Sequence, residues 1–202
     1  MELTSRGEGW LIAVLVGMRV LALTGSADSE EQFRAGMKDF TVSGGYWVDH
    51  NTGGLRGSET VDGFQFIPHF GYFLTDTHGT GWVRGNLELL AEPTLIHLDG
   101  RDSATIGGLS ALGRWVFTGW SVARPYVELG VGVLAGKVNQ RQTNCNVNFS
   151  IQGGPGVLLF SSQSTAVTVG YRFQHLSNAN QCSNNIGLNS SQFILGFSYF
   201  FP

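Results

Sequence analysis

The segment that most constrains the fold is 165–177, TAVTVGYRFQHLS, because its side chains alternate strictly in character. In a β-strand, residues two apart project from the same face. One face is apolar and ends in a His and a Ser: Val167, Val169, Tyr171, Phe173, His175 and Ser177. The opposite face carries Thr168, Gly170, Arg172 and Gln174. An apolar face that ends in reactive groups and backs onto an arginine indicates a barrel in lipid with a lipid substrate.

Eight strand-like segments can be read along the chain, separated by clusters of Gly, Asn, Ser and Asp. They cover residues 37–48, 62–76, 81–97, 105–118, 122–138, 147–161, 165–177 and 190–201. Each reaches the ~9–11 residues with which a tilted strand crosses a membrane. The pattern predicts an all-β protein, an eight-stranded antiparallel transmembrane β-barrel.

The last segment supports a membrane location for this barrel. Its larger face is formed by Phe193, Leu195, Phe197, Tyr199 and Phe201. Such alternating aromatics at the end of the chain resemble the C-terminal signal of bacterial outer-membrane barrels, although Pro202 follows the final aromatic residue. The alternative is a soluble, lipocalin-like barrel with its apolar face inside.

Charged residues within the segments distinguish these two barrels. In a membrane barrel, Arg84, Glu88, Glu128 and Arg172 would point into the lumen, where opposite charges can pair. In the soluble alternative they would lie on the surface. The net charge of -3 and the absence of a basic stripe exclude a nucleic-acid partner.

The N-terminus predicts export. Arg6 precedes a mostly apolar run, WLIAVLVGMRVLALT, and small residues follow it, so we expect a signal peptide over 1–27 and the barrel over 28–202. Cys145 and Cys182 are the two cysteines of the chain, and an oxidising compartment favours a disulfide between them. With both termini in the periplasm, both cysteines fall in outer loops, so the pairing is geometrically allowed.

The chemistry of the site rests on two residue types. A serine hydroxyl becomes a nucleophile when a base takes its proton, and histidine is the usual base. His175 and Ser177 supply these groups on one face at the outer end of a strand. A His-x-Ser pair by itself is also compatible with a purely structural role.

The surrounding residues resemble the lipid A 3-O-deacylase family, the PagL-type outer-membrane esterases. The resemblance rests on YRFQHLSNA at 171–179 and NIGLN at 185–189. It implies hydrolysis of the ester-linked acyl chain at the 3-position of lipid A, with His175 as base and Ser177 as nucleophile. It also implies oxyanion stabilisation by Asn178 and Asn185, for which turn formation is the alternative role.

The chain departs from the family pattern at one position. Where the family has a glutamate this chain has Asn189, and no Asp or Glu follows Glu128. Asn189 can orient the imidazole, as asparagine does in Cys-His-Asn proteases. A carboxylate from another outer loop, such as Asp49, Glu59 or Asp62, is the other option.

These observations predict an outer-membrane serine esterase whose partners are lipid A and outer-membrane lipid, with a homodimer left open. No metal-ligand spacing or cofactor motif occurs in the sequence. Three other functions stay open: a non-catalytic structural barrel, an esterase acting on other membrane lipids, and a soluble lipocalin-like binder.

Overall fold

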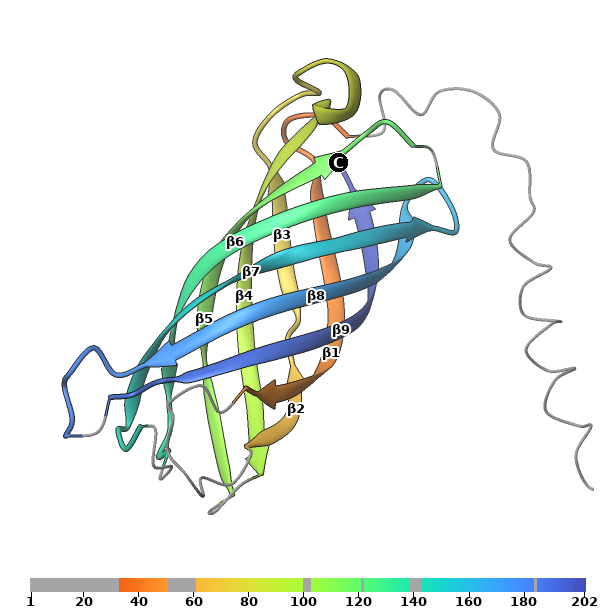
Figure 1. Cartoon of the computed structure of the whole chain (residues 1–202). Coiled ribbons are helices and arrows are strands. Elements are labelled where there is room, and N and C mark those ends of the chain that lie inside the picture. Colours follow the sequence, from red (N-terminus) through yellow and green to blue (C-terminus); the bar gives the residue numbers. More distant parts are fainter. Residues whose placement is uncertain (1–32, 51–60, 100–102, 121, 139–142, 184) are drawn as a thin grey trace, which may run out of the picture.

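The chain folds into one closed, tilted β-barrel (Figure 1). The computed structural model describes residues 33–50, 61–99, 103–120, 122–138, 143–183 and 185–202. Its strands are β1 (Lys38–Asp49), β2 (Asp62–Phe66), β3 (His69–Phe73), β4 (Gly85–Asp99), β5 (Ala104–Phe117), β6 (Ala123–Ala135), β7 (Val147–Phe160), β8 (Thr165–Ser177) and β9 (Leu188–Phe201). The predicted signal peptide lies outside the described residues. In the part of the chain that is described, no helix has the length and apolar character to cross a membrane.

The nine strands form an eight-stranded barrel because β2 and β3 are two halves of one strand. Both halves pair with β1 on one side and β4 on the other. They are separated by Ile67 and Pro68, a break that the predicted segment 62–76 did not include. Proline has no N–H for the ladder. Ser43 of β1 bridges the break, since its backbone oxygen accepts from Ile67 N–H at 2.9 Å and its hydroxyl donates to Ile67 O at 2.6 Å.

Antiparallel pairing closes the sheet between the first and last strands. β1 and β9 pair along their length, from Lys38 opposite Phe201 to Asp49 opposite Ser190. The predicted membrane-type barrel is confirmed in its sidedness, because the large side chains of the outer wall are apolar and exposed. On β9 these are Phe193, Leu195, Phe197 and Tyr199. The soluble alternative would have placed these side chains inside.

The barrel interior holds a chain of buried charges. Arg114 contacts Glu88 at 3.3 Å and Glu128 at 3.0 Å. Arg172 contacts the same Glu128 and binds both carboxylate oxygens of Glu92, at 2.7 and 2.8 Å. The predicted lumenal placement of Glu88, Glu128 and Arg172 is confirmed, and bidentate pairing offsets much of the cost of enclosing these charges.

Arg84 was placed wrongly by the alternation. It lies before β4 as the cap of a 3₁₀ helix, η1 (Gly81–Val83), and is half-buried. The predicted strand 81–97 therefore begins four residues too early. Gly81 has a φ of 60°, and the turn that it allows delays the start of the strand to Gly85.

Apolar clusters fill both ends of the lumen around the charged centre. At the end near the C-terminus, Phe33 stacks on Phe73 with ring centroids 4.5 Å apart, and the Arg124 guanidinium lies 4.6 Å from the Phe33 centroid. At the opposite end the cluster contains Trp47, Ile96, Leu98, Ile106, Leu134, Leu176 and Leu188, among others. The barrel is therefore packed with side chains, as a narrow barrel requires.

The charge chain makes a stability prediction. Replacing Arg172 with Met leaves Glu92 without its bidentate partner and removes one of two arginines from Glu128. Removing one partner of a buried ion pair costs about 3–5 kcal/mol. Urea unfolding of the barrel in lipid vesicles, followed by tryptophan fluorescence, should show this loss. Phe197→Leu, a matched change on the exposed outer wall, should alter the unfolding free energy much less, and equal effects would contradict the argument.

Candidate active site

The site begins with a pair of side chains that face each other across β8 and β9. His175 and Asn189 are direct partners in the strand register. The imidazole Nδ1–H donates to Asn189 Oδ1 at 2.8 Å, and both residues are half-buried. With its proton on Nδ1, a neutral imidazole carries its lone pair on Nε2. Asn189 thus selects the tautomer that a general base needs.

The next residues hold this pair in register from the inside of the barrel. Leu176 and Leu188 are also direct partners, and both belong to the buried cluster at this end of the lumen. Gly187 enters β9 with a φ of 83°, a conformation that favours glycine. A Cβ at Gly187 would lie 2.6 Å from Cε1 of His175, so the backbone itself packs against the imidazole edge.

Ser177 is the last residue of β8 and shares the outward face with His175. It is half-buried and lies opposite Phe149 of β7. Residues two apart on a strand are about 6.6 Å apart along its axis. The hydroxyl and the imidazole therefore occupy neighbouring positions on the outer wall, and no hydrogen bond among the described residues joins them.

Asn178 and Asn185 organise the loop that follows Ser177. The backbone N–H of Asn178 donates to Asn185 Oδ1 at 2.8 Å, and Asn185 Nδ2 donates to Asn180 Oδ1 at 2.9 Å. The Asn178 side chain is fully buried and donates to Thr143 Oγ1 at 3.2 Å. Both amides thus serve the turn geometry that the sequence offered as their alternative role. Their oxyanion role stays a prediction.

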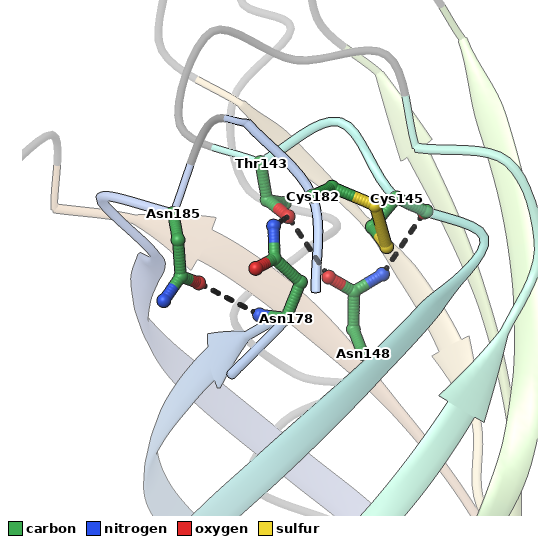
Figure 2. Close-up of a disulfide and its surroundings, with 6 residues drawn as sticks. All are labelled: Thr143, Cys145, Asn148, Asn178, Cys182 and Asn185. Atoms are coloured by element: carbon green, nitrogen blue, oxygen red, sulfur yellow. Dashed lines mark hydrogen bonds between the residues drawn. A yellow bond between two sulfur atoms is a disulfide. The ribbon is translucent and has the colours of Figure 1, made fainter. Parts of the chain in front are cut away.

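A disulfide between Cys145 and Cys182 joins this loop to the loop after β6 (Figure 2). Thr143 and Asn185 add an isolated β-bridge between the same two loops. Figure 2 shows the Asn178 amide pointing at Thr143, whose hydroxyl donates to Asn148 Oδ1 at 2.9 Å. The two loops are therefore fastened by covalent, backbone and side-chain links, all beside the end of β8.

None of the three carboxylates predicted as alternatives to Asn189 is seen to bond His175: two of them have other surroundings, and the third lies outside the described residues. Asp49 is buried on the inward face at the end of β1. Asp62 accepts a hydrogen bond from the Tyr46 hydroxyl. Glu59 lies outside the described residues. Within the described chain, no group of three or more His, Cys, Asp or Glu side chains could hold a metal ion.

A second serine–histidine contact on the same outer wall was missed by the sequence analysis. His50 Nε2 lies 2.8 Å from Ser191 Oγ, and the Tyr171 hydroxyl lies 2.8 Å from the same oxygen. His50 and Ser191 are 141 residues apart, so no local motif joins them. The available signal was Ser191 itself, a polar residue on the face of β9 that carries Phe193 and Leu195.

Comparison with solved structures shows the same fold in outer-membrane barrels. The outer membrane enzyme PagL aligns with a TM-score of 0.56 and 18% identity, over 78% of this chain and 97% of that chain. Neisserial surface protein A aligns with a TM-score of 0.59 and 14% identity, over 83% and 98%. Ail of Yersinia pestis aligns with a TM-score of 0.52 and 14% identity, over 84% and 100%.

Sequence comparison separates this chain from barrels that share only its fold. Among curated proteins, none matches it in sequence. The family model described as lipid A 3-O-deacylase (PagL) matches residues 53–198, which include β2 to β8, most of β9 and every candidate residue of the His175 site. The chain is therefore a β-barrel of the bacterial outer membrane that belongs to the lipid A 3-O-deacylase (PagL) family.

Proposed function

We propose that this protein is a serine esterase that removes the 3-O-linked acyl chain of lipid A, with Ser177 as nucleophile and His175 as base. The observation that carries the proposal is the 2.8 Å hydrogen bond from His175 Nδ1 to Asn189, made on the lipid-facing wall beside Ser177. An oriented imidazole on the lipid-facing wall contributes little to the structure, because the strand ladder already closes the barrel and other side chains already fill its lumen. Polar groups in that position are by default candidates for function.

The proposed reaction proceeds in two balanced steps. Ser177 Oγ attacks the ester carbonyl carbon while its proton passes to His175 Nε2. The tetrahedral intermediate then collapses, and the leaving sugar oxygen takes the proton from the imidazolium. Water, deprotonated by the same nitrogen, attacks the acyl-enzyme carbonyl; the bond to Ser177 Oγ then breaks, Ser177 takes the proton back from the imidazolium, and the fatty acid is released. The residues of this scheme need no cofactor.

The oxyanion of each intermediate requires hydrogen-bond donors close to the serine. The backbone N–H that follows Ser177 belongs to Asn178 and donates to Asn185 Oδ1 in this structure. In the proposed mechanism the substrate oxygen accepts from this N–H in place of Asn185 Oδ1.

Removing the nucleophile or the base should abolish activity and leave the barrel intact. Lipid A from cells that produce the unaltered chain should lack one 3-linked acyl group by mass spectrometry, whereas Ser177→Ala and His175→Ala should leave lipid A unchanged. Loss of either group typically lowers catalysis by a factor on the order of 10⁴ or more. Heat-dependent migration in gels would verify folding of each variant.

Two results of that experiment would decide against the proposal. Full deacylation by Ser177→Ala would exclude Ser177 as nucleophile. Unchanged lipid A with a folded, unaltered barrel would favour the non-catalytic barrel. A panel of phospholipid esters, tested on the purified protein, would separate lipid A deacylation from hydrolysis of other membrane lipids.

The role proposed for Asn189 predicts how its replacement changes the turnover rate. Asn189 orients the imidazole but carries no charge to stabilise the imidazolium of the transition state. Asn189→Asp supplies that charge with a side chain of the same size, so turnover should rise. Asn189→Leu keeps similar volume but removes the hydrogen bond that positions the base, and turnover should fall by up to about 10²–10⁴-fold, the usual contribution of a positioned base. Steady-state rates of the purified variants check both directions, and equal rates for all three proteins would remove Asn189 from the mechanism.

Removal of the disulfide is predicted to make the two loops that it joins open more often. Cys145→Ser/Cys182→Ser removes the covalent link between the loops after β6 and β8. Loops held by fewer contacts open more often. Limited proteolysis should therefore cut the loop between β8 and β9 faster, and lipid A turnover should fall while the barrel stays folded. Ser161→Ala/Ser162→Ala, which alters the turn at the other end of the barrel, should change neither property.

A further inference from the structure

Three polar side chains form a continuous hydrogen-bonded row on the outer wall, apart from the His175 pair. The Tyr171 hydroxyl and Ser191 Oγ are 2.8 Å apart, and Ser191 Oγ and His50 Nε2 are also 2.8 Å apart. We call these residues the Tyr171–Ser191–His50 row. Ser191 in the middle is 6% exposed, and the two ends, Tyr171 and His50, are exposed.

Two of its three members, Ser191 and Tyr171, lie deeper in the wall than the His175 pair, whereas His50 lies beside Asn189, to whose backbone oxygen its backbone N–H donates at 2.7 Å. Ser191 is paired with Phe173, two residues closer to the middle of the barrel along each strand than the pair of His175 and Asn189. The His50 ring stacks on Phe173, with centroids 6.1 Å apart, and Tyr171 packs edge-on against Phe193 at 5.6 Å. Aromatic neighbours on both sides therefore set this polar row among the side chains that meet acyl chains.

Counting hydrogens shows that the row always has one donor left over. The three residues supply three donor hydrogens: the tyrosine O–H, the serine O–H and one N–H of neutral histidine. Two hydrogen bonds join them, so two hydrogens are used, whichever way each bond points. Within the described residues no other side chain bonds to either end of the row. The third hydrogen needs an acceptor, and leaving it unsatisfied in an apolar environment is costly.

Lipid hydrocarbon offers no acceptor, but the carbonyl group at the head of an acyl chain does. Ser191 lies opposite Phe173 of β8, and Phe173 is four residues from Ser177 along that strand, a distance of about 13 Å. One carbonyl cannot reach both places. We propose that the Tyr171–Ser191–His50 row binds a carbonyl oxygen of an acyl chain next to the one that is cleaved. This inference rests on the proposed function, because it supplies a second point of attachment for a substrate with several acyl chains.

The row would act on binding of multi-acyl substrates and leave single-chain esters unaffected. The test uses Ser177→Ala as parent, so that bound substrate is not turned over, and adds His50→Phe/Tyr171→Phe. Both replacements keep an aromatic ring and remove the exposed ends of the row. The dissociation constant for lipid A should rise about fivefold to tenfold, as expected for one lost hydrogen bond. The dissociation constant for 4-nitrophenyl laurate, which has one chain, should stay the same.

A matched control carries the same chemical change elsewhere on the outer wall. His97 and Tyr199 are both exposed, at 53% and 50%, and neither belongs to the row. His97→Phe/Tyr199→Phe in the same parent should leave both dissociation constants unchanged. Equal weakening by the two double variants, or equal weakening of both ligands by the row variant, would overturn the proposal. So would an unchanged dissociation constant for lipid A.

Turnover is measured separately, so that the two proposals can fail independently. The chain that retains Ser177 is assayed on lipid A with and without His50→Phe/Tyr171→Phe. A raised KM with unchanged kcat is expected, because the row touches a chain that does not react. If the unaltered protein does not deacylate lipid A, the proposed function fails. The binding measurement on the Ser177→Ala parent then still decides whether the row holds a carbonyl.

Discussion

The structure depends on closure of the backbone hydrogen-bond ladder between β1 and β9. Hydrocarbon offers no partner for an N–H or C=O group, so a sheet that crosses a membrane can leave no open edge. Once the ladder is closed, each residue must point outward to lipid or inward to a narrow lumen. Apolar side chains are then required outside, and the lumen becomes the place where charge can be tolerated. The chain of Glu88, Arg114, Glu128, Arg172 and Glu92 follows from that division.

The same division makes the candidate site recognisable. On an outer wall that must be apolar, hydrogen-bonded polar groups have a cost and no packing advantage, so their presence calls for a role. The imidazole of His175 is held from three directions: by Asn189 across the strands, by the backbone of Gly187 at its edge, and by the buried Leu176–Leu188 pair beneath its strand. The barrel strands therefore fix the orientation of this side chain, as a packed core does in a soluble enzyme.

Alternation was enough to predict the strands and their sidedness, because lipid and lumen impose opposite demands on neighbouring residues. The count of eight strands, with both termini in the periplasm, also placed Cys145 and Cys182 at one end of the barrel, where the structure joins them. Alternation was not enough where the backbone leaves the ladder, as at Pro68 and Arg84. It was also silent on contacts between distant segments. The hydrogen bond of His50 to Ser191 depends on the register of β1 against β9, which no local pattern encodes.

Asn189 can be understood from its position at the edge of the lipid phase. A carboxylate that is half-buried beside acyl chains loses hydration, and only a charged or strongly donating partner recovers that energy. A neutral imidazole recovers little of it before the reaction begins. Asparagine keeps the acceptor oxygen that fixes the tautomer of His175 and avoids the desolvated charge in the resting enzyme. In the proposed mechanism Asn189 withholds charge stabilisation from the imidazolium, so the geometry of the site would be retained at the expense of rate. The proposed reaction would then depend more heavily on how the substrate is held, which is the role proposed for the Tyr171–Ser191–His50 row.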